Sequence, residues 1–204
     1  MTGRGRLVTL EGVDGAGKST HLQFIADALA APGRHVIVTR EPGGTELAEQ
    51  LRRAILGQAM DPQVETLLIF AARADHVARV IRPALDAGSW VVCDRFSDAT
   101  AAYQGAGKGV SAELIERLCQ VAHRGLQPDR TLLFDCSYEV ASKRLGASGK
   151  PLDRFEREDR AFFERVRTAY LARAQAEPAR IRVIDAAADA GSVRSAVERA
   201  LAGL

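Results

Sequence analysis

The sequence has few features of a zinc-binding, secreted or membrane protein. Its three cysteines, Cys93, Cys119 and Cys136, form no CxxC pair and lie beside no cluster of histidines, which argues against a zinc site. An odd number of cysteines without a signal-type N-terminus favours reduced thiols and a cytoplasmic protein. No apolar run approaches the roughly 20 residues that a membrane helix needs, so we expect no membrane partner.

The chain also has little net charge. Its formal charge is only +2, and its 26% of charged residues is ordinary. Proteins that bind nucleic acid usually present a basic field, so we expect no nucleic-acid partner. The cations are 24 arginines and only 4 lysines, which makes each lysine more informative. With 47% hydrophobic residues in 204 positions, the chain can form one core, and we predict a single domain over residues 1–204.

Short apolar runs alternate with helix-like segments along the chain. The runs predict strands at residues 7–11, 35–39, 90–93, 131–134 and 181–184. The segments between them predict helices at about residues 19–31, 46–56, 62–87, 98–104, 112–123, 137–145, 155–176 and 191–202, with a bend near Pro83 and an N-cap at Ser111. This order indicates an α/β fold in which helices cover both faces of a five-stranded parallel sheet. The polar, glycine-bearing stretch 146–157 predicts a short mobile lid.

The strongest motif is GVDGAGKS, residues 12–19, which matches GxxxxGKS/T. It follows the first predicted strand and opens the first helix, as this motif requires. Its glycines let backbone N–H groups and the helix N-terminus approach phosphates. Lys18 then reaches the β- and γ-phosphates, and the Ser19 hydroxyl can hold Mg²⁺. The motif predicts that a nucleoside triphosphate contacts Gly12, Val13, Asp14, Gly15, Ala16, Gly17, Lys18, Ser19 and Thr20, but it does not identify a phosphoryl acceptor.

The rest of the sequence narrows the class of P-loop protein. Lys108, Lys143 and Lys150 all lack the NKxD context that selects guanine, which argues against a GTPase. Helicases and transporters are usually larger. A compact chain with a polar flap late in the sequence suits a kinase that closes over two nucleotides.

Four segments resemble bacterial thymidylate kinases in order and spacing: EGVDGAGKST (11–20), TREPGGTELAEQLR (39–52), FAARADHV (70–77) and CDRFSDATAAYQG (93–105). The resemblance continues to the LDRFE segment at 152–156 and covers essentially the whole chain. It implies a P-loop kinase fold and Mg²⁺-dependent transfer of the γ-phosphoryl group of ATP to dTMP in dTTP synthesis. It also implies a homodimer and a cis peptide bond between Glu41 and Pro42.

The resemblance assigns roles around the acceptor base. Phe70 resembles the aromatic residue that stacks on thymine, and Arg73 the cation that hydrogen-bonds the base edge. These two residues share a helix face because they lie three positions apart, although many relatives space the pair by four. Thr100 and Gln104 resemble polar contacts to the base, and Tyr103 the ring that crowds the sugar C2′.

The resemblance also assigns roles around the phosphates. Asp14 is expected to reach the sugar 3′-hydroxyl and the metal region, and Glu41 to line the cleft. Arg52, rather than Arg40, is expected to hold the dTMP phosphate. Arg95 is expected to bridge the donor and acceptor phosphates, because two polyanions must be brought together there. Asp94 could bind Mg²⁺ through water.

The catalytic cation of the lid is a separate expectation. One branch of the family carries an arginine in the P-loop at the position of Gly15. This chain has glycine at that position, so the missing arginine needs a replacement. Four cations in or just before the predicted lid are candidates, namely Lys143, Arg144, Lys150 and Arg154. Arg144 resembles the residue that lies against adenine. Lys150 and Arg154 are expected to close over the phosphates, with Arg154 the more important, so that its loss should lower kcat and leave the KM for dTMP unchanged.

Two other functions remain open at this point. A related kinase could use another nucleoside monophosphate or a deoxynucleoside as acceptor, which Phe70, Arg73 and Tyr103 argue against. A regulatory nucleotide-binding module without transfer activity is a second alternative. Arg95 and the charged lid argue against it, because a binding module needs no cation between two phosphate sites.

Overall fold

Five parallel strands form one sheet in the order β2–β3–β1–β4–β5. The structure, a computed structural model, describes residues 4–30, 33–149 and 151–204. The strands are β1 (Leu7–Glu11), β2 (Val36–Arg40), β3 (Trp90–Asp94), β4 (Arg130–Asp135) and β5 (Ile181–Asp185). Each lies within one residue of its predicted bounds, and the predicted α/β fold is confirmed.

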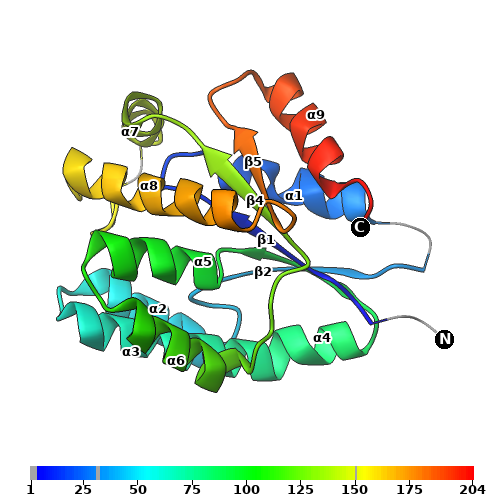
Figure 1. Cartoon of the computed structure of the whole chain (residues 1–204), viewed down its shortest axis with the longest axis horizontal. Coiled ribbons are helices and arrows are strands. Elements are labelled where there is room, and N and C mark those ends of the chain that lie inside the picture. The colour runs from blue at the N-terminus through cyan, green and yellow to red at the C-terminus, as the bar shows by residue number, and fades with distance from the viewer. Residues whose placement is uncertain (1–3, 31–32, 150) are drawn as a thin grey trace.

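The central strand β1 explains why the predicted strands are almost continuously apolar. All five of its residues are buried, and Leu7 and Leu10 are fully covered from opposite faces of the sheet. Strands covered on both faces need apolar residues at every position rather than at alternate ones. The strands run away from the two chain ends toward the opposite side of the molecule, where α7 (Tyr138–Ala147) lies (Figure 1).

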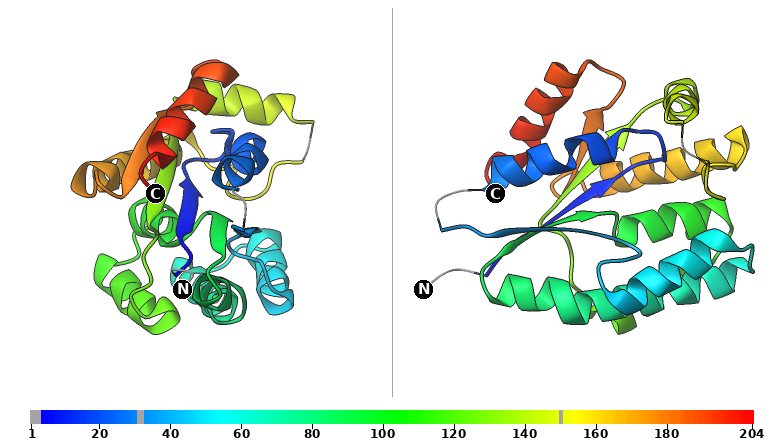
Figure 2. Two further views of the ribbon diagram at one scale, coloured as in Figure 1. Left: turned by 90° about the vertical axis from the view of Figure 1, so that its right-hand side faces the viewer. Right: turned by 180° about the vertical axis from the view of Figure 1, so that it is seen from behind.

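Helices cover both faces of this sheet. On one face, α1 (Lys18–Leu29) contacts β2 and β3, and α9 (Ala190–Leu201) contacts β4 and β5. On the other face, α4 (Arg82–Asp86) contacts β3, and α8 (Arg160–Ala176) contacts β4 and β5. Accordingly, α8 is in front in Figure 1, whereas α1 is in front in the right-hand view of Figure 2.

The predicted helix at 62–87 is a composite of three helical segments. It begins as α3 (Pro62–His76), continues as the π-helical turn η1 (Val77–Ile81) and ends as α4. Pro83 has no N–H for the hydrogen bond of a regular helix, and the wider turn just before it accommodates this loss. A second π-helical segment, η2 (Ala101–Gly107), extends α5 (Ser97–Thr100). The helix predicted at 98–104 therefore continues to Gly107.

Two further helices pack on either side of α3. They are α2 (Glu46–Gly57) and α6 (Ala112–His123), and both pack against α3. The predicted N-cap is confirmed, since the Ser111 hydroxyl accepts a hydrogen bond from the Leu114 N–H.

The charged helix α8 begins at Arg160 rather than at the predicted residue 155. Asp153 folds the preceding residues into a turn, because its carboxylate accepts hydrogen bonds from the N–H groups of Phe155 and Glu156. Asp159 then caps α8. We call residues 151–157 the lid segment.

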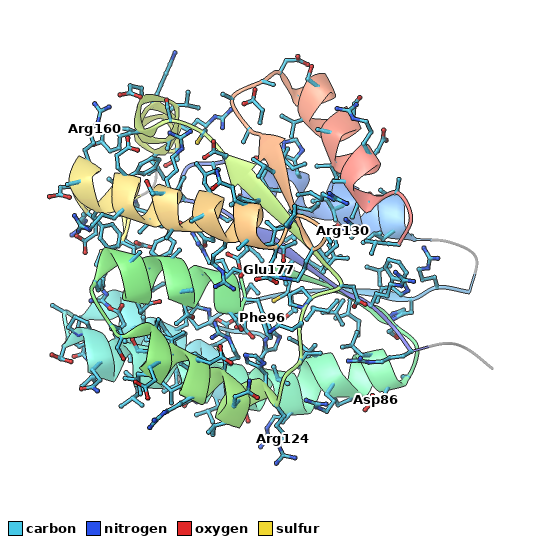
Figure 3. The ribbon with its side chains drawn as sticks, in the orientation of Figure 1. Asp86, Phe96, Arg124, Arg130, Arg160 and Glu177 are labelled. Atoms are coloured by element: carbon cyan, nitrogen blue, oxygen red, sulfur yellow. The ribbon has the colours of Figure 1, made fainter. Side chains whose placement is uncertain are left out.

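The side chains labelled in Figure 3 include one in the interior of the protein and several at its surface. In Figure 3, Phe96 lies in the interior, whereas Arg124 and Arg160 lie at the periphery. Phe96 is the second residue after β3 and is 1% exposed, so this strand end is anchored in the core. Arg95 precedes it and is therefore held at the carboxyl end of the sheet, where open α/β sheets bind their ligands.

Candidate functional site

The P-loop, residues 12–19, connects β1 to α1, and two of its glycines, Gly12 and Gly15, have no room for a side chain. Gly12 and Gly15 have φ angles of 132° and 80°, which L side chains rarely adopt. A Cβ at Gly12 would lie 2.2 Å from the Phe134 carbonyl oxygen, and one at Gly15 would lie 2.5 Å from the Ala141 oxygen. This loop therefore excludes an arginine at position 15, so a second cation has to come from another segment.

Lys18 begins α1 and turns back over the P-loop. Its ammonium group donates hydrogen bonds to the carbonyl oxygens of Gly12 at 2.9 Å and Val13 at 3.0 Å. The side chain is buried, and desolvation followed by the charge of Arg95 lowers the pKa of Lys18, while Asp14 and Asp94 oppose this shift. A buried ammonium group fixed at a helix N-terminus is suited to phosphate binding.

An open cavity lies above the P-loop, and we call it the donor cavity. Its walls include residues 14–21 of the P-loop and α1, together with the start of α9. Arg144 lines it from α7 and donates hydrogen bonds to the carbonyl oxygens of Ala16 at 3.3 Å and Ala186 at 2.8 Å. Every predicted P-loop residue from Asp14 to Thr20 lines this cavity, as do Asp94 and Arg95.

A second cavity, the acceptor cavity, lies between α3, α5 and the lid segment. The predicted acceptor residues that line it are Asp14, Glu41, Arg52, Arg73, Arg95, Thr100, Tyr103 and Gln104. The two cavities share four side chains, which are Asp14, Arg52, Arg95 and Asp153. The donor and acceptor cavities therefore meet at a wall that contains two arginines and two carboxylates.

Arg95 is the most tightly held residue of this shared wall. Its guanidinium donates hydrogen bonds to Asp14 Oδ1 at 2.5 Å, Tyr103 Oη at 3.1 Å and Tyr170 Oη at 3.2 Å. Its φ angle is 69°, which is a strained value for arginine and is typical of functional sites. Burial alone would lower the pKa of Arg95, but the charge of Asp14 and the neighbouring tyrosines raise it overall.

A buried network fixes Arg73 in the wall of the acceptor cavity. Arg73 Nε donates to Glu41 Oε2 at 2.6 Å, and Nη2 donates to Thr100 Oγ1 at 3.0 Å. Glu41 also contacts His76 at 3.0 Å. The predicted cis bond between Glu41 and Pro42 is confirmed, and Arg52 Nη1 donates to the Pro42 carbonyl oxygen at 3.0 Å.

Phe70 does not lie where the resemblance placed it. It packs with Ile115 and Cys119 in a separate apolar cluster, with the Arg73 guanidinium 4.8 Å from its ring centre. Ile69 lines the acceptor cavity instead. The four-residue spacing from Ile69 to Arg73 was the signal for this, but three- and four-residue spacings both keep two side chains on one helix face.

The sequence reasoning missed Glu65, which is fully buried behind Gln104, a residue of the acceptor cavity wall. Lys108 Nζ donates to both of its carboxylate oxygens, at 3.0 and 2.9 Å. Arg154 of the lid segment forms an ion pair with the same carboxylate. Arg154 lines neither the donor nor the acceptor cavity, so the structure does not bring it over the phosphate site, and Lys150 lies outside the described residues.

The residues at the end of the P-loop can accommodate Mg²⁺. Ser19 and Asp94 both line the donor cavity, and Asp94 Oδ1 is a buried oxygen without a hydrogen-bond partner among the described residues. Hydroxyl and carboxylate oxygens are the ligands that Mg²⁺ prefers, so this donor set fits. Glu41, His76 and Cys93 also lie within 4.8 Å of one another, but Arg73 already supplies the cation beside Glu41.

No helix among residues 4–30, 33–149 and 151–204 is both long and apolar enough to cross a membrane. The cysteines at 93, 119 and 136 are all buried and unpaired.

Comparisons with known proteins agree with this geometry. The family model of thymidylate kinase matches residues 10–197. The thymidylate kinase of Bordetella petrii is 56% identical over 100% of this chain and 98% of its own length, and that of Cupriavidus metallidurans is 52% identical over 98% and 100%. The crystal structure of thymidylate kinase from Ehrlichia chaffeensis superposes with a TM-score of 0.74 at 33% identity, over 89% of this chain and 93% of that one.

Proposed function

The chain belongs to the thymidylate kinase family, and we propose that it transfers the γ-phosphoryl group of ATP to dTMP across the wall shared by its two cavities. One observation carries this proposal: Asp14, Arg52, Arg95 and Asp153 line both the donor and the acceptor cavity. A phosphoryl group can pass in line only where the two nucleotides meet. A module that merely binds ATP would need neither the second cavity nor a strained arginine between the two.

On the donor side, the P-loop backbone and Lys18 bind the triphosphate, and Arg144 lies against the adenine end. Ser19 and Asp94 would hold Mg²⁺, which neutralises phosphate charge when bound. Arg95 contacts both phosphate chains and stabilises charge on the group in flight. No covalent intermediate with the protein is needed, because positioning and electrostatics supply most of the catalysis.

On the acceptor side, each residue acts on a different part of dTMP. Arg52 binds the phosphate, and Asp14 accepts a hydrogen bond from the sugar 3′-hydroxyl. Tyr103 restricts space beside the sugar C2′, and its hydroxyl donates to Asp14 Oδ2 at 2.8 Å. Arg73, fixed by Glu41, donates to the base edge.

We expect this arrangement to select thymine. In a coupled ADP-release assay, kcat/KM for dTMP should exceed that for dCMP, dGMP and AMP by at least about a hundredfold. A wrong base leaves buried polar groups of the protein without hydrogen-bond partners, which strongly weakens its transition-state binding. Equal use of dCMP or AMP would contradict the proposed acceptor.

The position of Arg154 changes the effect expected for the lid. Since Arg154 is paired with Glu65 beside the acceptor cavity, Arg154→Ala should raise the KM for dTMP by about three- to tenfold, as expected for loss of a partly buried charge contact. The KM for ATP should stay within about twofold. Steady-state kinetics with each substrate varied would test this, with Arg160→Ala at the exposed start of α8 as the control. A lower kcat with an unchanged KM for dTMP would instead support a lid cation acting on the phosphates.

We further propose that the protein is a cytoplasmic homodimer. Val64 and Leu67 on α3 are 48% and 49% exposed, and Val121 on α6 is 78% exposed. Because α3 and α6 pack together, these apolar side chains support the dimer surface that the family resemblance implies. The buried free thiols support a reducing compartment.

A further inference from the structure

Gln104, a proposed contact of the acceptor base, hydrogen-bonds a buried carboxylate through its side-chain amide. It extends from η2 into the wall of the acceptor cavity. Its side-chain nitrogen Nε2 donates a hydrogen bond to Glu65 Oε1 at 2.8 Å. Glu65 reaches this point from α3 and is 0% exposed. The contact therefore joins two segments that are far apart in the sequence, directly behind the wall of the acceptor cavity.

The surroundings of Glu65 decide which way the Gln104 amide faces. Lys108 and Arg154 both pair with the Glu65 carboxylate, and these cations favour its ionised form. An ionised carboxylate can only accept hydrogen bonds. Gln104 must therefore turn its NH₂ group toward Glu65, which leaves its Oε1 on the other side of the amide, where no described residue donates to it.

We propose that Glu65 is a positioning residue for base selectivity, because it fixes the Gln104 amide with its carbonyl oxygen available to the acceptor base. Thymine carries a hydrogen-bond donor, N3–H, between two carbonyl groups. Cytosine carries an acceptor at N3. A fixed Oε1 pairs with the first base and is repelled by the second, so the choice between them depends on a residue that need not touch either base.

The ion pairs of Glu65 with Lys108 and Arg154 also connect Glu65 to the lid segment. Arg154 belongs to the lid segment, and Lys108 follows η2. The carboxylate that orients Gln104 thus also holds the lid segment at the acceptor cavity. The inference rests on dTMP being the acceptor.

The test compares dTMP with dCMP in the Glu65→Gln variant. A glutamine at 65 can accept or donate, so Gln104 is no longer confined to one orientation. We expect kcat/KM for dTMP to fall about tenfold, mainly through KM, as for loss of one buried hydrogen bond. The ratio of kcat/KM for dTMP over dCMP should fall by at least the same factor, whereas the KM for ATP should not change. Glu113→Gln, at an exposed ion pair with Arg117 on α6, is the matched control and should keep the wild-type ratio.

A double-mutant cycle separates positioning from a general loss of structure. Gln104→Leu removes the proposed base contact itself. It should also lower the ratio of kcat/KM for dTMP over dCMP. In that background, Glu65→Gln should lower it little further, because the two residues act through one contact. Additive effects of the two substitutions on the ratio would overturn the inference.

A charge-preserving variant covers the case in which Glu65→Gln fails to fold. Glu65→Asp keeps an anion for Lys108 and Arg154 but withdraws it by one methylene from Gln104, so the ratio should again fall. A folded Glu65→Gln or Glu65→Asp protein with the wild-type ratio would overturn the inference. A wild-type protein that does not phosphorylate dTMP in the same assay would overturn the proposed function itself.

Discussion

Arg95→Gly is expected to lower kcat by about 10³-fold, which corresponds to roughly 4 kcal/mol of transition-state stabilisation. Losses of this size follow the removal of an arginine that compensates charge on a phosphoryl group in flight. Arg95 is placed for that role, since it lines both cavities and is held by Asp14 and two tyrosine hydroxyls. Steady-state and single-turnover rates at saturating ATP and dTMP would measure the effect.

Glycine is the informative replacement because of the backbone at this position. Arg95 has a φ angle of 69°, which glycine adopts without strain. The variant therefore removes the guanidinium group without adding backbone strain. Arg124→Gly is the matched control, since Arg124 is the other described non-glycine residue with a positive φ angle, at 49°, and lies on the periphery (Figure 3). It should leave kcat unchanged.

Arg95→Lys adds a test of geometry. Lysine keeps the charge but lacks the planar fork that contacts Asp14 and both tyrosines at once, so its kcat should lie between those of the wild type and Arg95→Gly. A folded Arg95→Gly protein with kcat within about tenfold of the wild type would show that the transferred group is stabilised by other residues.

The contiguous parts of this site could be predicted from the sequence, and the reason is local geometry. The P-loop places its glycines, Lys18 and Ser19 within eight residues, between a strand and a helix, so that one motif specifies backbone and chemistry together. Arg95 was predictable for a similar reason, because it directly follows a buried strand of a parallel sheet.

The residues whose positions differ from the expectation depend on contacts between distant segments. Ile69 and Phe70 are neighbouring apolar residues on α3, and only the packing of α6 against that helix decides which of them faces the cavity. The position of Arg154 in the polar lid favours a cation at the donor site. No local pattern in the sequence indicates that Arg154 forms an ion pair with Glu65 on α3. A buried carboxylate with two cationic partners emerges only when three separate segments meet.

Lys18→Ala is expected to lower kcat by about 10²-fold or more and to raise the KM for ATP, with the fold intact. Lys18 is the one cation of the P-loop. A second cation cannot stand at position 15, because Gly15 has a φ angle of 80° and no room for a side chain. Its ammonium group is already fixed at the loop by the carbonyl oxygens of Gly12 and Val13, so phosphate binding needs little reorganisation of the site.

Lys143→Ala provides the control for that experiment. Lys143 is an exposed lysine on α7 that lines neither the donor nor the acceptor cavity, and its loss should leave kcat unchanged. ADP release with dTMP as acceptor would be measured for both variants, and circular dichroism would establish that each is folded. Arg95 remains in place in Lys18→Ala, so the acceptor phosphate should still bind and the KM for dTMP should change less than kcat. Near-normal turnover by a folded Lys18→Ala protein would contradict the role of this lysine at the β- and γ-phosphates, and Arg95 would then have to stabilise the transferred group alone.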